Sequence, residues 1–202
     1  GEVHNKKSHT RKLFDKITDG NLNWAKMDEN YDRIIYPDKS YDFIAPKENF
    51  IKKLSEYFPD EKLAITNYVD LLGAQSKNSK KFFASKLVPK WLYPIVGKNM
   101  TKSFFRNSDK TTNEVLDELT NNKKLQSVLS GQWGDYGLPP KRSSFAMHAM
   151  VARHYLDGAN YPIGGSRMIA EHTTDLIESL GGKVVVNADV NEIIVKRNKA
   201  IG

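Results

Sequence analysis

The stretch of the sequence from Gly131 to Ser166 constrains the fold most strongly. It begins with GQWGDYGLPP and ends with YPIGGS. Between these motifs, residues 145–152 carry no formal charge as long as His148 is neutral. A helix that is apolar on all sides is usually buried. The sequence therefore predicts a buried helix between two loops whose backbones are constrained by glycine and proline.

The composition is that of an ordinary globular protein. Of the 202 residues, 39% are hydrophobic and 27% are charged, which is enough for one domain or somewhat more with a sizeable core. The chain has no cysteine, and this excludes a disulfide framework and cysteine-based zinc or redox chemistry. A reducing cytosol is the simpler interpretation, so we expect a cytoplasmic protein.

Turn residues and hydrophobic spacing predict a β-hairpin followed by a helical block. Two runs rich in β-branched and aromatic residues flank residues 37–40, whose composition is typical of a turn, so we expect a hairpin over 31–45. The predicted helices then cover 47–58, a long segment from about residue 61, the region after a capping-box pattern at 111–114, residues around 125–129, a helix capped by Ser143 or Ser144, and a helix from Ser166 to Gly181.

The end of the sequence predicts further β-structure. Val184–Val186 is expected to form a strand buried on both faces, Val190–Val195 a second strand, and the residues from Lys199 a third. Strands, then helices, then a helix with more strands predict an α+β or α/β architecture with a helical insertion. The best candidate for a domain boundary lies near Gly164.

The positive charge is concentrated in one segment. Residues 76–110 contain nine basic residues and one acidic residue, a net charge of +8, while the rest of the chain carries −1 of the total +7. Aromatic and aliphatic residues alternate with the lysines. Three interpretations stay open: exposed lysines with buried apolar stems, a basic amphipathic surface that binds anionic lipid, or a nucleic-acid contact, which the basic pI permits. We find no motif for binding DNA or RNA.

The histidines and serines do not form a recognisable catalytic or metal-binding pattern. His148 and His154 are six residues apart, whereas two metal ligands on one helix are usually three or four apart, so we expect no metal site. The Gly-x-Ser-x-Gly motif is absent. His148 has two open interpretations, a hydrogen-bonded core residue or a proton donor, and we assign no catalytic residue.

The two glycine-containing loops each permit a functional and a structural interpretation. The side chains of Trp133, Tyr136, Leu138 and Pro139 could line an apolar substrate pocket or fill part of the core. Residues 164–166, Gly-Gly-Ser, could present backbone N–H groups to an anion or a cofactor at the start of a helix, or could form a tight turn.

Seven motifs resemble the phytoene desaturase and retinol saturase family of FAD-dependent oxidoreductases, which includes carotenoid isomerases, and in particular its saturase-like bacterial members. They extend over nearly the whole chain: GEVH, DGNLNWAKMD, YDFIAPKENF, SDKTTNEVLDELT, GQWGDYGLPP, SSFAMHAMVARHYLDGANYPIGGS and GGKVVVNADVNEIIV. The resemblance implies that residues 1–163 are an incomplete substrate-binding domain with a mixed sheet and a helical insertion. Residues 164–202 would be a returning segment of a Rossmann-type FAD-binding domain.

The resemblance also implies roles for individual residues. The substrate would be bordered by Trp133, Tyr136, Leu138, Pro139, His148 and Tyr161. FAD would be contacted by Pro162, Gly164, Gly165, Ser166 and Val190. Near the mouth of the substrate tunnel, the membrane-facing residues would be Lys86, Lys90, Trp91, Leu92, Tyr93 and Lys98.

The expected activity is that of an FAD-dependent oxidoreductase on an apolar polyene or isoprenoid, carotenoid- or retinoid-like, with saturation, desaturation and isomerisation left open. A Rossmann-type domain needs a GxGxxG motif, which this chain lacks, so we expect an interior fragment that neither binds FAD nor catalyses alone. The alternative is a non-catalytic module that binds membrane lipid through residues 76–110. We expect no nucleic-acid partner, and a cytoplasmic protein that attaches peripherally to the inner membrane face.

Overall fold

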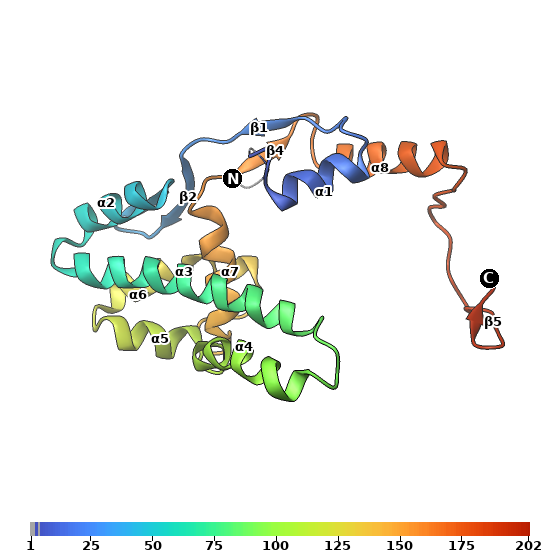
Figure 1. Ribbon diagram of the computed structural model, residues 1–202. Coiled ribbons are helices and arrows are strands. Elements are labelled where there is room, and N and C mark those ends of the chain that lie inside the picture. Colours follow the sequence, from blue (N-terminus) through green and yellow to red (C-terminus); the bar gives the residue numbers. More distant parts are fainter. Residues whose placement is uncertain (1–2, 4) are drawn as a thin grey trace. The chain divides into compact units, whose positions relative to one another are not determined.

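The protein is described by a computed structural model that covers residue 3 and residues 5–202, without the side chains of Val96 and Lys98 (Figure 1). The rest of the GEVH motif, residues 1, 2 and 4, lies outside the described part. The chain divides into two compact units. Unit 1 contains residues 26–160, and unit 2 contains residues 6–25 together with residues 161–202.

Unit 1 begins with the predicted β-hairpin. Strands β2 (Asn30–Ile35) and β3 (Ser40–Ile44) pair antiparallel, with Ile34 opposite Tyr41. Tyr41 and Phe43 alternate with more exposed residues along β3 and are buried. Helix α2 (Lys47–Tyr57) packs against this face, and the rings of Phe43 and Phe50 lie 5.1 Å apart. The hairpin and the helix after it are confirmed.

The rest of unit 1 is helical, and its central element is α3. The elements are a short 3-10 helix η2 (Pro59–Glu61), α3 (Lys62–Ser85), α4 (Tyr93–Ser108), α5 (Thr112–Leu119), α6 (Lys123–Leu129), a 3-10 helix η3 (Gly131–Asp135) and α7 (Phe145–Tyr155). Helix α3 packs against both α4 and α7. Ile65 and Leu72 of α3 share one buried core with Phe145 and Ala149 of α7, so the predicted burial of the uncharged helix is confirmed.

The helix starts follow the predicted capping chemistry. The backbone N–H of Thr111 donates to the Glu114 carboxylate over 2.7 Å, and the Glu114 N–H donates back to the Thr111 hydroxyl over 3.2 Å. This reciprocal pair satisfies two N–H groups that a helix start leaves unpaired. At the start of α7 the Ser144 hydroxyl accepts from the Ala146 N–H.

Unit 2 contains a helix that the sequence analysis did not predict. Helix α1 (His9–Ile17) starts at Ser8, whose hydroxyl accepts from the Arg11 N–H over 3.0 Å. It contacts the predicted helix α8 (Arg167–Ser179). The ring of Phe14 meets that of Trp24 edge-on at 5.0 Å. Strands β1 (Trp24–Lys26) and β4 (Asn160–Pro162) pair with each other.

The strand predicted at 184–186 is wrong, of the strand predicted at 190–195 only Val195 lies in a strand, and the strand predicted from Lys199 is confirmed. Within the described residues after α8, the only strands are β5 (Val195–Lys196) and β6 (Lys199–Ala200), which form a two-residue antiparallel pair. Val185 and Val190 are largely exposed. A strand buried on both faces needs a neighbour on each side and a layer over each face, and the described chain provides neither here.

The predicted mixed sheet is not seen either, because every sheet among the described residues has two strands. The division between the units falls between residues 160 and 161, close to the predicted boundary at 163. The grouping of residues 6–25 with the C-terminal region was not predicted. The assignment of a substrate domain and an FAD domain stays a prediction.

Replacing Leu72 with Ala should lower the free energy of unfolding by about 2–5 kcal/mol, because a buried Leu leaves a cavity when truncated. Leu63→Ala, on the same helix but exposed, is the matched control and should change stability by less than about 0.5 kcal/mol. Urea unfolding followed by far-ultraviolet circular dichroism measures both. Equal effects of the two variants would mean that α3 does not form the core.

Candidate functional site

The GQWGDYGLPP segment is held against the β-hairpin at its first residues. A Cβ atom on Gly131 would lie 2.6 Å from Cδ1 of Ile34, so only glycine fits there without a shift. The side-chain amide of Gln132 donates to the Asp32 carboxylate over 3.0 Å. After η3, Gly137 has a φ of +80°, which side-chain-bearing residues rarely adopt. The first half of the segment is therefore fixed in place.

The second half of the segment is tied to the start of α5. The N–H groups of Arg142 and Ser143 donate to the Pro139 carbonyl, over 2.8 and 3.0 Å. The hydroxyls of Thr112 and Ser143 lie 2.8 Å apart, and the Thr112 N–H donates to the Ser143 carbonyl. Hydrogen bonds at both ends make this a rigid loop, which suits a residue-positioning role.

His148 lies between two tyrosine hydroxyls at the centre of unit 1. Its Nε2 is 2.8 Å from the Tyr68 hydroxyl of α3, and its Nδ1 is 3.0 Å from the Tyr136 hydroxyl of the loop. A neutral imidazole has one N–H donor and one acceptor nitrogen, so one tyrosine accepts and the other donates. Both nitrogens of this fully buried ring are thus satisfied.

Burial sets the protonation states of this cluster. Desolvation lowers the pKa of His148 to about 4, so the ring is neutral at pH 7. Burial also raises the pKa values of the Tyr68 and Tyr136 hydroxyls, which therefore stay protonated. The structure favours the interpretation of His148 as a hydrogen-bonded core residue, because its ring has no exposed surface through which to contact a substrate.

The other predicted substrate residues are not gathered around His148. Trp133 and Leu138 are 45% and 43% exposed on the loop, and Pro139 is exposed as well. Tyr136 is half-buried and is the only predicted substrate residue that the described structure hydrogen-bonds to His148. Tyr161 belongs to unit 2 and is exposed.

Pro139 does line a cavity. The cavity has a volume of about 580 Å³ and lies beside the loop, α5 and α6, with Leu116, Pro139 and Pro140 on its apolar side and Lys123 and Arg142 among its polar lining. This volume is within the range of small-molecule sites. Of the predicted substrate residues, all of which the structure describes, only Pro139 lines this cavity, so the predicted pocket stays a prediction.

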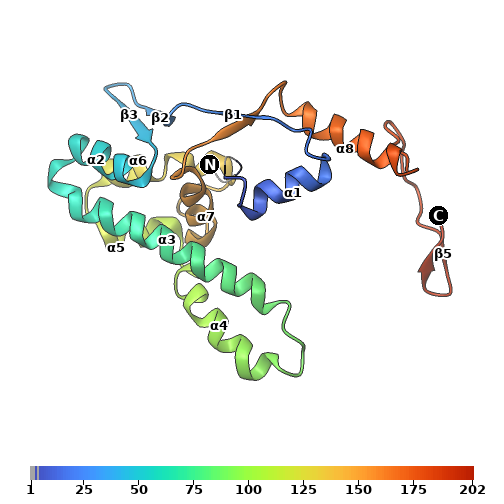
Figure 2. The same cartoon turned by 45° about the horizontal axis from the view of Figure 1, so that its top comes forward.

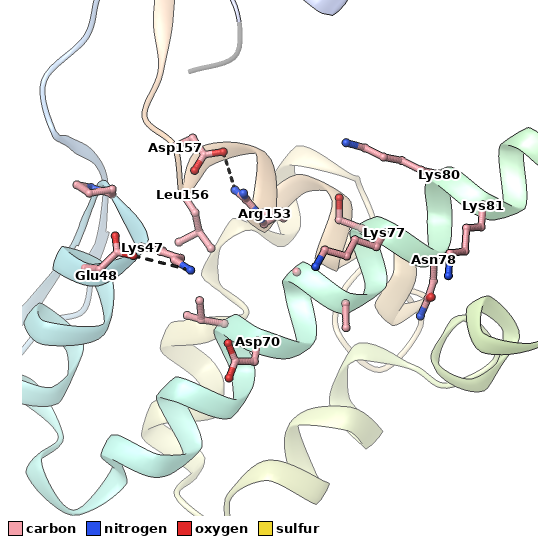
Figure 3. A pocket seen from close by; sticks show the side chains of 15 residues that line it. Lys47, Glu48, Asp70, Lys77, Asn78, Lys80, Lys81, Arg153, Leu156 and Asp157 are labelled. Atoms are coloured by element: carbon pink, nitrogen blue, oxygen red, sulfur yellow. Dashed lines mark hydrogen bonds and ion pairs between the residues drawn. The ribbon is translucent and has the colours of Figure 1, made fainter. Parts of the chain in front are cut away.

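A second cavity of unit 1, of about 730 Å³, is lined by α2, α3 and the end of α7 (Figure 3). Its charged lining contains Lys47, Lys77, Lys80, Lys81 and Arg153 with Glu48, Asp70 and Asp157. Two of these pairs are bridged, Lys47 to Glu48 at 3.8 Å and Arg153 to Asp157 at 2.8 Å. Covering these charges with an apolar molecule would remove them from water, so this cavity does not suit a polyene.

Among the predicted FAD residues of unit 2, those of the loop at 162–166 fit a contact with a cofactor, whereas Val190 does not. Gly164 and Gly165 have φ values of +93° and +95°. A Cβ on Gly165 would meet nothing within 4 Å, so the backbone is open to a close approach there. Ser166 begins α8 without a side-chain capping hydrogen bond. In contrast, Val190 is exposed in a segment without secondary structure.

The described residues lack two other features, a metal-ligating cluster and a membrane-spanning helix. They contain no group of three or more His, Cys, Asp or Glu side chains that could hold a metal ion. Among the helices that the structure describes, none has the length and apolar character that crossing a membrane requires.

Comparison with known proteins identifies relatives along the full sequence. No protein-family model matches the chain. It is 34% identical to an all-trans-retinol 13,14-reductase from Danio rerio over 100% of the chain, and 28% identical over 98% to a protein of that species called inactive all-trans-retinol 13,14-reductase. It is 30% identical, over 41% of the chain, to a 4,4'-diapophytoene desaturase from Staphylococcus haemolyticus.

The chain belongs to the retinol saturase and phytoene desaturase family. The resemblance predicted from the motifs is thereby confirmed. The chain spans about a third of the length of the two reductases, 35% and 34%, and matches 17% of the desaturase.

His148 should make stability depend on pH. In the unfolded chain its pKa returns to about 6.5, so the unfolded state takes up a proton that the folded state rejects until about pH 4. The free energy of unfolding should therefore fall as the pH drops from 6.5 to 4, by up to about 3 kcal/mol. His148→Gln should remove this pH dependence of the free energy of unfolding. Urea unfolding curves recorded at a series of pH values measure it.

The control is His154→Gln, which changes an exposed histidine on the same helix. The free energy of unfolding of this variant should still fall as the pH drops from 6.5 to 4. If His148→Gln and the unmodified chain gave parallel curves, the buried imidazole would not be the group that titrates on unfolding.

Proposed function

We propose that this chain is the central part of an FAD-dependent oxidoreductase that acts on the double bonds of an apolar polyene of the retinoid or carotenoid type. The observation that carries the proposal is the similarity of the whole chain to an all-trans-retinol 13,14-reductase. The shorter match to a diapophytoene desaturase supports it. Reduction and desaturation are opposite two-electron reactions at a carbon–carbon double bond, and a flavin serves either direction.

In this proposal unit 1 supplies part of the substrate site through the GQWGDYGLPP loop. A polyene offers few groups for hydrogen bonding, so its site has to be built mainly from apolar walls. Trp133 and Leu138 provide exposed apolar surface on a loop whose two ends are fixed by hydrogen bonds. His148 then acts as a positioning residue, because its neutral ring holds the Tyr136 hydroxyl.

The loop of Pro162, Gly164, Gly165 and Ser166 would hold part of the FAD. Its open backbone at Gly165 permits a close approach, and the N–H groups at the start of α8 favour negative charge. When bound, FAD supplies the two-electron chemistry. The chain lacks a GxGxxG motif and spans about a third of the length of the Danio rerio reductase. The remaining FAD contacts would therefore come from sequence beyond these 202 residues.

The first test is the visible absorbance spectrum of the 202-residue chain, purified beside a protein in which this sequence is extended to its natural ends. We expect a flavin band in the extended protein and a colourless chain. Circular dichroism should show that both are helical. Two folded but colourless proteins would contradict the proposal, and stoichiometric flavin on the chain alone would contradict the predicted division of the FAD site.

The second test replaces Trp133 with Ala in the extended protein. Loss of a large apolar contact should lower kcat/KM for all-trans-retinol about tenfold or more, while flavin content stays unchanged. Met147→Ala is the control, since Met147 is comparably exposed on α7 and should leave both quantities unchanged. Parallel losses of turnover and flavin in Trp133→Ala would show that the loop has a structural role instead.

A further inference from the structure

The far end of the α3–α4 pair projects from unit 1. We define the α3–α4 tip as residues 82–106, which comprise the end of α3, the connection at 86–92 and most of α4 (Figure 2). The rings of Phe82 and Phe104 stack at 4.2 Å. Next to the tip, the Asn78 side-chain amide donates to the Ser103 carbonyl over 3.3 Å. These contacts hold the two helices together.

The outer surface of the α3–α4 tip is apolar where the helices connect. Leu87 is 87% exposed, Trp91 76% and Ile95 70%. Phe83 and Phe105, on the two helices beside the stacked rings, are also exposed. Single exposed apolar residues are common, but a group of large ones on one projection marks a surface that is covered in use.

Basic residues accompany these apolar side chains. Residues 82–106 contain five basic residues and no acidic residue. Lys86, Lys90, Lys102 and Arg106 are exposed, and no ion pair of the described residues involves any of the four. The Lys86 ammonium lies 4.6 Å from the centre of the Phe82 ring. Its apolar stem thus follows the aromatic surface while its charge stays at the surface.

We propose that the α3–α4 tip docks onto the surface of an anionic lipid bilayer. Trp91, Leu87 and Ile95 would enter the boundary between headgroups and acyl chains, and the basic side chains would meet the anionic headgroups. Nucleic acid would satisfy the charges but leave the apolar side chains in water. A second copy would bring the same positive tip against this one, which like charges oppose.

The residues predicted to face the membrane differ in how exposed they are. Lys86, Lys90 and Trp91 are exposed, as a membrane-facing role requires. Leu92 and Tyr93 are half-buried, and the Tyr93 ring lies against Gly97, where a Cβ would come within 2.3 Å of it. We therefore place Leu92 and Tyr93 in the support of the tip. The side chain of Lys98 lies outside the described part.

Co-sedimentation of the chain with phosphatidylcholine vesicles, with and without phosphatidylglycerol, tests the proposal. We expect binding to the anionic vesicles at low salt, weakened as salt screens the charges. A Trp24→Phe/Trp133→Phe variant leaves Trp91 as the only one of three tryptophans. Its fluorescence should shift to the blue and be quenched by brominated acyl chains. Retained fluorescence in the presence of bound brominated vesicles would overturn the proposal.

A matched pair of charge reversals separates the tip from general electrostatic attraction. Lys86→Glu/Lys90→Glu should weaken vesicle binding about tenfold or more, because each basic residue near an anionic surface contributes about fivefold in affinity. Lys52→Glu/Lys62→Glu changes two exposed lysines on α2 and the start of α3 by the same charge and should bind within about twofold of the unmodified chain.

Three further outcomes would overturn the proposal: no binding by the folded chain at low salt, equal losses in both double variants, or a dimer in which Trp91 is shielded without lipid. The last would assign the surface to a second copy. The assay needs neither flavin nor substrate, so its failure leaves the proposed oxidoreductase function intact, and a colourless extended protein leaves the docking proposal intact.

Discussion

The arrangement of unit 1 depends on one buried polar contact, the imidazole of His148 between two tyrosine hydroxyls. The three partners come from α3, the GQWGDYGLPP loop and α7. A buried ring whose nitrogens lack partners would destabilise the fold by the full desolvation penalty. The contact therefore requires all three elements to be in place together, and it fixes the loop relative to the apolar core formed by Ile65, Leu72 and Phe145.

Apart from singly exposed residues such as Ile35 and Leu63, exposed apolar side chains cluster in three segments of the described chain: the loop at Trp133 and Leu138, the α3–α4 tip, and residues 184–194 of unit 2. Each would be covered by something different. The proposals assign a polyene to the loop and a bilayer to the tip. Val184–Val186 has the composition of a buried strand but forms no strand among the described residues; under the proposed function, a sheet contributed by further sequence would cover it.

The features that the sequence predicted correctly are those set by local chemistry. The turn between β2 and β3 and the capping box at Thr111 involve residues a few positions apart. The strand at Val184–Val186 failed because its stability depends on partners that local sequence does not contain. Within the site, burial of His148 followed from its uncharged helix, but its partner Tyr68 is 80 residues away, and no local pattern indicates such a contact.

Docking at a bilayer and oxidation or reduction of a polyene are connected by a physical constraint. Transferring an apolar molecule of about twenty carbons from lipid into water costs at least about 10 kcal/mol, because each CH₂ group contributes about 0.8 kcal/mol. A free-energy difference of this size lowers the equilibrium concentration of the molecule in water by about seven orders of magnitude. An enzyme that bound its substrate only from aqueous solution would be limited by this low concentration. A projection that holds the protein at the bilayer surface removes the aqueous step, and it needs only the exposed apolar and basic residues that the α3–α4 tip provides.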